Sequence, residues 1–490
     1  MRMTGRPMEG ETSLETLRAR CIPAGQEHLL AHWDRLSGPQ REQLASQILS
    51  VDFELLEKLR RGGDGAEELS TEELSTEDLS TEDLSTIAQR AEPPNAVLIG
   101  QDYHGLSAED AKQEGNRAIA AGKVAMILVA GGQGTRLGFD QPKGMFPIGP
   151  VSGRTLLEMH VDSLLGAMKR FGASIPMLLM VSPATETATR IYLEENERFG
   201  LGATELYPFL QGSMPAIDTR SGRILMESPH ELALSPDGHG GLVAALANSG
   251  LLAEMRGRGI EQFYYAQVDN PLVRACDPEL LGYHRLTGSQ MTTQVVRKRF
   301  AKERVGNVVQ VDGRTRIIEY SDLPDAIAEQ TLPDGSLKLW AGNIAVHVFD
   351  LAFLNQVAGL SDSLPFHQAS KAVNYVDSDG VKHKPTTPNA TKYERFIFDL
   401  LPAADRTLVV EGDPAEVFAP VKNADGAAVD TPESSRRAIS RLHASWLQQA
   451  GVTVQEGVLV EIHPLWAWDA DEVRDKIQTP CTLSADTYFA

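Results

Sequence analysis

Short apolar runs alternate with longer amphipathic stretches between residues 96 and 410. Each run is brief and ends at glycine or polar residues, which is typical of a buried strand. The predicted strands are 124–130, 177–181, 263–268, 292–297, 308–311, 316–320 and 339–348. Apolar residues at helical spacing predict helices between them, including 155–170 and 241–258. This alternation predicts an α/β fold with a mostly parallel, mixed sheet and helices on both faces.

The two ends of the chain follow other patterns. Apolar residues at helical spacing predict helices between 14 and 61, with a new helix starting around Pro39. Near the carboxyl end, a helix over 433–450 precedes the short apolar runs 451–454 and 457–462, which predict a small β subdomain. The predicted parts are an N-terminal helical region at 1–95, a central α/β domain at 96–410 and a C-terminal subdomain at 411–490.

Residues 67–86 form a repeat of Glu, Glu or Asp, Leu, Ser and Thr with a period of five residues. Five residues of α-helix turn through roughly 500°, so the leucines spread around a helix instead of forming one stripe. The acidic side chains also repel one another. We therefore predict an acidic, solvated linker that closes the N-terminal region.

Composition narrows the classes of function. The chain has 490 residues and a net charge of −21, with no visible basic patch, so nucleic acid is not an expected partner. Its three cysteines lie far apart and show no metal-ligand spacing. With few cysteines and no signal peptide, we expect a cytoplasmic protein. No apolar stretch approaches the roughly 18 residues of a membrane span, so no membrane is expected either.

The most informative chemistry follows the apolar run 124–130. Gly131, Gly132 and Gly134 form a loop where a parallel sheet places its ligands. Glycines let backbone N–H groups approach phosphate oxygens closely. Arg136 and Lys143 add positive charge beside the loop. This combination predicts a polyphosphate site.

Two familiar phosphate loops do not match this segment. The dinucleotide fingerprint needs Gly-x-Gly-x-x-Gly, but Leu137 occupies the third glycine position and Gly138 comes one residue late. The P-loop needs Gly-Lys-Ser/Thr, whereas Lys143 stands between Pro142 and Gly144. No obvious ribose-binding acid follows about 20 residues on. A nicotinamide oxidoreductase is therefore excluded.

Polar residues at later strand and loop ends extend the predicted site. The Gln211 amide can read a pyrimidine edge, because it offers both a donor and acceptors. Gly238 and His239 precede a predicted helix, where the glycines can bring backbone against a base or sugar. Asp269 ends an apolar strand. A carboxylate beside phosphates there predicts Mg²⁺ as the cofactor, although the same aspartate could simply cap a helix.

Further candidates lie downstream. Glu319 and Asn343 could bond sugar hydroxyls, and Lys392 and Lys422 could place charge near phosphates. Phe396 and Phe398 alternate, which predicts one face of a strand. That face could line a sugar site or belong to the core.

The combined motifs resemble one known family. Leu-Val-Ala-Gly-Gly-Gln-Gly-Thr-Arg-Leu-Gly at 128–138, Pro-Lys-Gly at 142–144 and Pro-Val-Lys-Asn at 420–423 are similar to the eukaryotic-type UDP-N-acetylhexosamine pyrophosphorylases. The resemblance covers most of the chain and implies a Rossmann-like fold of the nucleotide-diphospho-sugar transferase type, with 96–410 as the catalytic domain. The UTP contacts that it implies are Gly131, Gly132, Lys143, Gln211, Gly238, Asp269 and Lys392. The sugar contacts are His239, Glu319, Asn343, Phe396 and Phe398.

The expected reaction joins UTP and a hexose 1-phosphate, giving a UDP-sugar and pyrophosphate. We expect Arg136, Lys143 and Lys422 to neutralise phosphate charge, with Mg²⁺ on Asp269. N-acetylglucosamine 1-phosphate is the expected sugar substrate. However, the acetylhexosamine enzymes carry asparagine where this chain has His239, and Gly-His-Gly resembles UDP-glucose pyrophosphorylases. A UDP-glucose or broad-specificity enzyme is therefore an alternative, as is a non-catalytic sugar-nucleotide-binding regulator.

Overall fold

The computed structural model describes residues 13–62, 84–359, 364–478 and 480–490, and the chain divides into two compact units. We call them the small unit and the sheet unit. The small unit comprises Met1–Glu77, Gly212–Gly240 and Pro365–Phe396. The sheet unit comprises Asp78–Gln211, Gly241–Leu364 and Ile397–Ala490. The division into three consecutive ranges stays a prediction.

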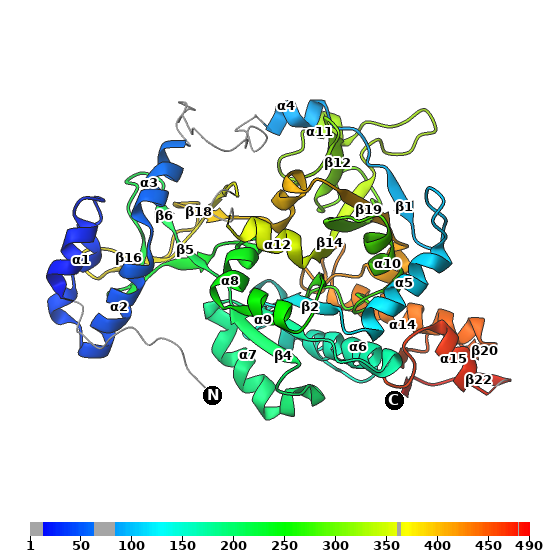
Figure 1. Ribbon diagram of the computed structural model, residues 1–490. Coiled ribbons are helices and arrows are strands. Elements are labelled where there is room, and N and C mark those ends of the chain that lie inside the picture. The colour runs from blue at the N-terminus through cyan, green and yellow to red at the C-terminus, as the bar shows by residue number, and fades with distance from the viewer. Residues whose placement is uncertain (1–12, 63–83, 360–363, 479) are drawn as a thin grey trace. The chain divides into compact units, whose positions relative to one another are not determined.

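A mixed sheet forms the centre of the sheet unit (Figure 1). Its strand order is β1 (Ala96–Leu98), β19 (Thr407–Glu411), β11 (Met291–Arg297), β14 (Ala341–Asp350), β10 (Gln262–Gln267), β2 (Val124–Val129), β3 (Met177–Val181) and β4 (Leu206–Leu210). All neighbours in this order are parallel except β14, which runs antiparallel to β10 and β11. The hairpin of β12 (Asn307–Val311) and β13 (Arg314–Ile318) extends the sheet. The prediction of a mostly parallel, mixed α/β sheet is confirmed.

The predicted strands all form, with shifts of a few residues at their ends. Helix α6 (Leu156–Phe171) also matches its prediction closely. The prediction of one helix over 241–258 is wrong, because two helices form, α8 (Leu242–Asn248) and α9 (Leu251–Gly257). Gly250 between them has φ 77°, a left-handed conformation that interrupts a helix.

Helices α5 (Ala108–Ala120) and α10 (Pro278–Leu286) pack closely on each other in the sheet unit. Their contact depends on glycine. A Cβ at Gly115 would lie 1.8 Å from the carbonyl oxygen of Pro278, and one at Gly282 would lie 1.7 Å from that of Ala111. Backbone meets backbone at both points, so the two helices cannot accommodate a larger residue there without separating.

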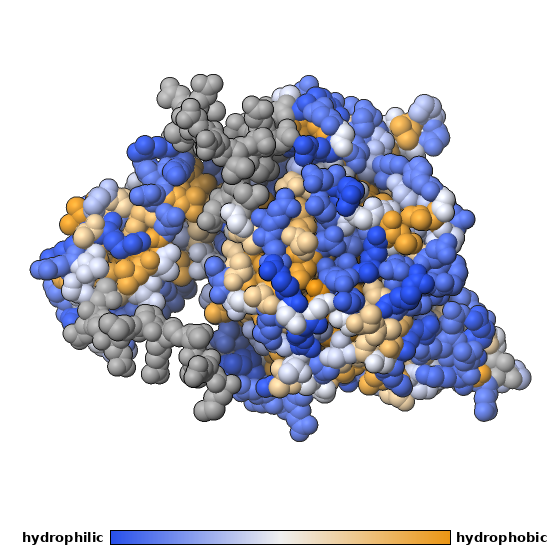
Figure 2. All heavy atoms as spheres, viewed as in Figure 1, coloured by the Kyte–Doolittle hydropathy of each residue, from blue (hydrophilic) through white to orange (hydrophobic). Residues whose placement is uncertain are grey.

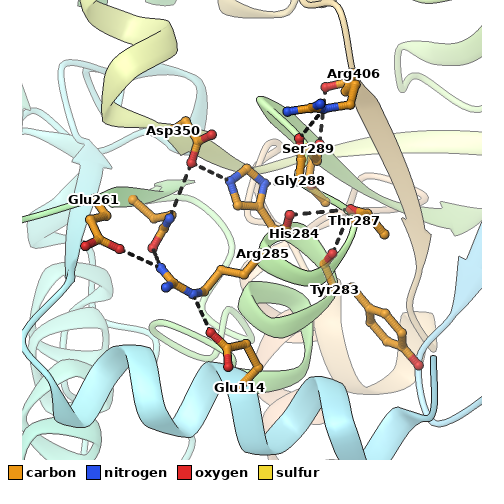
Figure 3. Close-up of polar contacts among 12 residues, drawn as sticks. Glu114, Glu261, Tyr283, His284, Arg285, Thr287, Gly288, Ser289, Asp350 and Arg406 are labelled. Carbon is orange, nitrogen blue, oxygen red and sulfur yellow. Dashed lines mark hydrogen bonds and ion pairs between the residues drawn. The ribbon is translucent and has the colours of Figure 1, made fainter.

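A polar network fixes helix α10 to the amino end of β10 (Figure 3). The Arg285 guanidinium donates to Glu114 at 2.8 Å and to Glu261 at 3.0 Å. The buried His284 ring lies 2.9 Å from the Thr292 hydroxyl and 3.3 Å from the Asp350 carboxylate. These contacts lie at the sheet edge opposite the one where the parallel strands end.

The C-terminal part begins with α14 (Pro432–Gln449) and contains α15 (Ala470–Lys476). Four short strands accompany these helices: β20 (Val452–Val454), β21 (Val460–Ile462), β22 (Cys481–Leu483) and β23 (Thr487–Phe489). They form two parallel pairs, β20 with β22 and β21 with β23. Leu447 and Val460 are buried in the apolar cluster that these elements share. The short strands expected near the carboxyl end form, together with two helices, while a separate C-terminal subdomain at 411–490 stays a prediction.

The small unit combines helices with short antiparallel strands. Its helices are α1 (Leu14–Cys21), α2 (Gly38–Ser50) and α3 (Phe53–Gly62), so the predicted helical stretch forms in pieces. One of its sheets has the strand order β15 (His367–Lys371), β18 (Ala390–Glu394) and β6 (Ile217–Asp218). A second has the order β17 (Lys382–His383), β16 (Tyr375–Val376), β7 (Met226–Ser228) and β8 (Glu231–Leu232). A third pairs β5 (Ser213–Pro215) with β9 (Leu234–Pro236). One apolar cluster contains Leu17, Ile224 and Tyr393, from all three segments of this unit.

The acidic repeat at 67–86 lies outside the described residues up to 83, and its last residues belong to α4 (Leu84–Gln89). Among the helices formed by the described ranges, none combines the length and hydropathy that a bilayer crossing needs. On the face drawn in Figure 2, polar side chains cover most of the surface and hydrophobic ones form small separate patches.

Candidate active site

The candidate site in the sheet unit lies where the parallel strands end, which we call the carboxyl edge. Strands β2, β3, β4 and β10 all finish at this edge, because they run parallel to one another. Within two residues of these strand ends stand Gly131, Ser182, Gln211 and Asp269. The antiparallel strand β14 begins at the same edge and brings Asn343 there. This is the edge at which open α/β sheets bind ligands.

Hydrogen bonds within the glycine loop hold its two ends together. The N–H of Gly134 donates to the Gln141 carbonyl at 3.0 Å, and that of Lys143 donates to the Gly132 carbonyl at 3.0 Å. A Cβ at Gly134 would lie 2.7 Å from the Phe139 carbonyl oxygen. A Cβ at Gly132 would lie no closer than 4.0 Å to a described side chain, namely to Cδ of Lys143. Glycine at position 134 is needed for the fold of the loop, whereas glycine at position 132 leaves open space beside the Lys143 side chain.

Lys143 and Asp269 form an ion pair at the carboxyl edge, with 3.3 Å between Nζ and Oδ2. Only 17% of the Lys143 side chain and 16% of the Asp269 side chain are exposed. Burial alone would raise the pKa of Asp269, but the charges of Lys143 and Lys422 outweigh it and lower that pKa below its ordinary value. The carboxylate is therefore ionised at neutral pH and faces two cations.

Lys422 reaches this cluster on an irregular segment between α13 (Pro414–Val417) and α14. The N–H of the preceding Val421 donates to the Asp269 carbonyl at 2.8 Å. The Lys422 ammonium lies 5.6 Å from the ring centre of Phe418. The structure thus brings Lys143, Asp269 and Lys422 together, as the sequence predicted, although their chemical roles stay predictions.

Asn270 is a residue of this region that sequence reasoning missed. It is 2% exposed. Its amide nitrogen donates to the Val417 carbonyl at 2.7 Å, and its amide oxygen accepts the Ala419 N–H at 3.0 Å. Asn270 therefore ties the strand end that carries Asp269 to the segment that carries Lys422. Its position directly after Asp269 was the available signal, but its partners lie far away in the sequence.

Gln211 lies beside the first glycine of the loop. The Gln211 side chain is buried, and its Oε1 would lie 3.0 Å from a Cβ at Gly131. On the other side, the Ser182 hydroxyl donates to the Gly131 carbonyl at 2.7 Å. Gly131 is thus enclosed on two sides, and the sequence did not identify Ser182 as one of its neighbours.

Glu319 and Asn343 lie together around Gly306, as expected from their strand ends. The N–H of Asn343 donates to the Gly306 carbonyl at 2.8 Å. A Cβ at Gly306 would lie 2.9 Å from Oε1 of Glu319 and 3.7 Å from Cβ of Asn343. The Asn343 amide oxygen accepts the N–H of Ala345, whose φ of 56° marks an irregularity in β14. This kink fixes Asn343 at the strand start.

Gly238 and His239 belong to the small unit. Gly238 has φ 85°, and a Cβ there would lie 2.2 Å from the Arg395 carbonyl oxygen, so glycine is required. The His239 ring stacks on Phe396 with 5.3 Å between centroids, and the His367 ring lies 4.4 Å from Phe396. Burial and the nearby His367 lower the pKa of His239 to about 4. His239 is therefore a neutral ring at pH 7.

The prediction of Phe396 and Phe398 on one strand face is wrong. Strand β18 ends at Glu394, and Phe398 lies in the 3₁₀ helix η8 (Ile397–Ala403). Phe396 is half-buried between the buried Arg395 and Ile397, whereas Phe398 is buried, so the two rings do not share one face. Two aromatic residues were too short a pattern to establish a period of two. Phe396 belongs to the small unit and Phe398 is a buried residue of the sheet unit.

The remaining candidates are less enclosed. Lys392 lies in β18, opposite Ala369 of β15, with a half-buried side chain. Arg136 lies in the 3₁₀ turn η3 (Thr135–Leu137) of the glycine loop and is exposed. An exposed arginine beside such a loop is available to a phosphate group from solution.

A resident metal cage is not part of the described structure. Within residues 13–62, 84–359, 364–478 and 480–490, no group of three or more His, Cys, Asp or Glu side chains is placed to hold a metal ion. Asp269 offers one carboxylate at the carboxyl edge. Mg²⁺ typically uses one or two carboxylates together with water and substrate phosphates, so the residues present fit a metal that arrives with a nucleotide.

A family model and similar proteins from other organisms all point to UDP-sugar pyrophosphorylases. The family model described as UTP–glucose-1-phosphate uridylyltransferase matches residues 69–439. The chain is 37% identical to the UDP-N-acetylhexosamine pyrophosphorylase-like protein 1 of Xenopus tropicalis, covering 90% of this chain and 86% of the relative. It is 36% identical to the UDP-N-acetylglucosamine pyrophosphorylase of Saccharomyces cerevisiae, covering 90% of this chain and 92% of the relative.

One solved structure matches nearly the full length of the chain. The uridine diphosphate N-acetylglucosamine pyrophosphorylase of Trypanosoma brucei, in complex with inhibitor, matches with a TM-score of 0.79 and 25% identity. The match covers 99% of each chain. A UDP-glucose pyrophosphorylase from Leishmania major is more distant, with a TM-score of 0.57 and 17% identity over 77% of this chain and 79% of that one, and shows only the shared fold.

Proposed function

Because the chain belongs to the UTP–glucose-1-phosphate uridylyltransferase family, we propose that it joins UTP and N-acetylglucosamine 1-phosphate into UDP-N-acetylglucosamine and pyrophosphate. The chain is a nucleotidyltransferase by family. The observation that carries the proposal is the cluster of Lys143, Asp269 and Lys422 beside the glycine loop. A relative named UDP-N-acetylglucosamine pyrophosphorylase is 36% identical to the chain over 90% of the chain's length.

The reaction needs no general base. A phosphate monoester has a second pKa of about 6, so the sugar phosphate is already a nucleophilic anion at neutral pH. Its oxygen attacks the α-phosphorus of UTP, the bond between the α-phosphorus and the bridging oxygen breaks, and pyrophosphate leaves with that electron pair. The main obstacle is repulsion between two anions. Positioning and charge neutralisation are therefore the tasks of the protein.

The placement of the cations supports a division of these tasks. Lys422 neutralises the attacking phosphate and the α-phosphate, while Lys143 and Arg136 neutralise the departing pyrophosphate. Mg²⁺ with Asp269 as its protein ligand would supply further neutralisation of phosphate charge. Backbone N–H groups of the glycine loop, together with the Gln211 amide, would orient the nucleotide. Glu319 and Asn343 would bond the hydroxyl groups of the sugar.

The proposed sugar preference is argued from the names of the relatives and from His239 in the small unit. The Xenopus and yeast relatives carry names for acetylhexosamine substrates. A UDP-glucose or broad-specificity activity is the second candidate, because His239 stands in a Gly-His-Gly segment and fills space against Phe396. Both candidates use the same chemistry at the phosphates. The reaction takes place in the cytoplasm under this proposal.

A pyrophosphate-release assay tests the proposal directly. UTP is incubated with Mg²⁺ and one sugar 1-phosphate at a time, comparing N-acetylglucosamine, N-acetylgalactosamine, glucose and galactose 1-phosphates. We expect the highest kcat/KM with N-acetylglucosamine 1-phosphate. Preference for glucose 1-phosphate would establish the second candidate. UTP binding without pyrophosphate release from any of the four would contradict an enzymatic function.

A further inference from the structure

Lys422 depends on an irregular loop for its position, since it lies in neither a helix nor a strand. Backbone hydrogen bonds hold together the two ends of the loop from Lys422 to Asp430. Both the Lys422 N–H, at 2.8 Å, and the Asn423 N–H, at 3.0 Å, donate to the Asp430 carbonyl. Asp430 is followed directly by Thr431, the N-cap of α14. The backbone of Asp430 therefore fixes the position of the Lys422 backbone, from which the Lys422 side chain extends.

Asp430 holds a strained backbone conformation. Its φ is 58°, in the left-handed region that non-glycine residues rarely adopt. Such strain persists only where surrounding contacts compensate for it. The Asp430 side chain is 13% exposed, and its carboxylate accepts a hydrogen bond from the Arg299 guanidinium at 3.4 Å. Arg299 is thus the cationic group that meets the carboxylate of this strained residue.

Arg299 is in turn held by Glu303. Its Nε donates to the Glu303 carboxylate at 2.6 Å, and its backbone N–H donates to the same carboxylate at 2.6 Å. The Glu303 side chain is only 7% exposed. Two nearly buried acids therefore flank one guanidinium just beyond the carboxyl end of β11. A planar guanidinium with several fixed donors suits such a bridge better than an ammonium group does.

From these contacts we propose that Arg299 is a positioning residue that acts on Lys422 through Asp430. Glu303 orients the guanidinium, the guanidinium holds the Asp430 carboxylate, and the Asp430 carbonyl holds the Lys422 backbone. The inference rests on the proposed function for its effect on turnover. Arg299 touches neither Lys143 nor Asp269 in the structure, so its effect is confined to the Lys422 side of the site.

The first test is a double-mutant cycle on turnover. Arg299→Gln lowers kcat by about 10- to 100-fold, the effect expected of a small misplacement of a catalytic group, and leaves the KM for UTP within about twofold. In the Lys422→Ala background the same substitution has no further effect, because the residue that it positions is gone. Arg299→Lys recovers part of kcat. An additive loss in the Lys422→Ala background would overturn the proposal.

Arg297→Gln is the matched control. Arg297 lies at the end of the same strand, and its guanidinium pairs with Glu411 at 2.7 Å and lies over the Trp340 ring. In the part of the chain that the structure describes, Arg297 bonds Glu411 and not the Lys422 loop, so kcat stays within about twofold of the original. Equal losses for Arg297→Gln and Arg299→Gln would show a general effect of the strand end and contradict a specific role of Arg299.

A second measurement does not require catalysis. An amine-reactive acylating reagent is added briefly, and labelling of Lys422 is quantified by mass spectrometry. Labelling of Lys422 rises several-fold in Arg299→Gln and stays unchanged in Arg297→Gln. Unchanged labelling in Arg299→Gln overturns the inference even if no sugar phosphate supports turnover. If only the proposed function is wrong, the unsubstituted protein shows no turnover, while Arg299→Gln still shows increased labelling of Lys422.

Discussion

Lys143 and Lys422 both act on the pKa of Asp269, although they come from segments far apart in the chain. Their joint effect exceeds the penalty of burying the carboxylate, so the three residues form one electrostatic group. A buried site of this kind favours ligands that bring negative charge, because two cations facing one carboxylate leave an excess positive charge.

Removing either cation is expected to reduce turnover strongly. Lys143→Ala and Lys422→Ala should each lower kcat/KM by on the order of 10²-fold or more, since each removes a positive charge that the proposed mechanism assigns to the reacting phosphates. Lys123→Ala is the control, because Lys123 pairs with Glu261 at the opposite sheet edge. Steady-state pyrophosphate release measures all three. Near-original turnover in both site variants would show the mechanism to be wrong.

His239 is expected to influence which sugar is used. Its neutral ring stacks on Phe396 and occupies space that a smaller amide would leave open. His239→Asn should raise the ratio of kcat/KM for N-acetylglucosamine 1-phosphate to that for glucose 1-phosphate by about 10-fold or more. The ratio is measured within one preparation, so partial misfolding does not alter it. An unchanged ratio would remove His239 from the determinants of sugar preference.

Single residues also show where sequence reasoning succeeded and where it did not. Asp269 could be placed at the carboxyl edge because it directly follows a predicted apolar strand, whereas the strand before Gln211 was not among those predicted. Asn270, Ser182 and Asp430 were missed, since their contacts are with backbone groups that only the folded chain brings near. Nothing in the local sequence around such residues reports these partners.

At the scale of elements, the central strands were predictable because a strand buried on both faces reads as an unbroken apolar run. Strand β2, buried over nearly its whole length, is the clearest example. The antiparallel direction of β14 left no such sign, because a buried strand has the same composition in either direction. The break between α8 and α9 was also missed, although Gly250 marked its position.

The crossing of α5 and α10 supports a prediction about stability. Gly282→Ala should destabilise the protein by at least about 2 kcal/mol, because the new methyl group would overlap the Ala111 carbonyl. Gly257→Ala, near the end of α9, is the matched control, since a Cβ there meets nothing within 4 Å. It should be neutral or slightly stabilising. Thermal unfolding compares the two, and equal unfolding temperatures would contradict the close contact.

At the scale of the whole molecule, buried histidines link stability to pH. Burial lowers the pKa of His160 and of His443 to about 4, and the pKa of His239 is lowered to about 4 as well. An unfolded histidine has a pKa near 6.5, so below that pH the unfolded chain binds protons that the folded chain excludes. The contribution of these neutral rings to the free energy of unfolding is therefore fully present above pH 6.5. It is lost as the pH drops toward 4, by at most ~3 kcal/mol for each histidine.

Thermal unfolding between pH 7 and pH 5 at constant ionic strength checks this dependence. The unfolding temperature should fall steadily over that range. His443→Gln should show a shallower fall, because glutamine does not titrate and its amide oxygen can accept the Ile462 N–H that His443 now accepts. An unfolding temperature that is constant from pH 7 to pH 5 would show that these rings are not held neutral by burial.

The small unit draws its apolar cluster from three separate stretches of chain, represented by Leu17, Ile224 and Tyr393. During synthesis the first stretch leaves the ribosome long before the last. The apolar faces of its helices therefore stay exposed until residue 396 has been made. Contacts between such distant stretches form slowly, and exposed apolar surface favours aggregation in the meantime. Production of this protein should therefore benefit from chaperones that shield the newly made N-terminal helices.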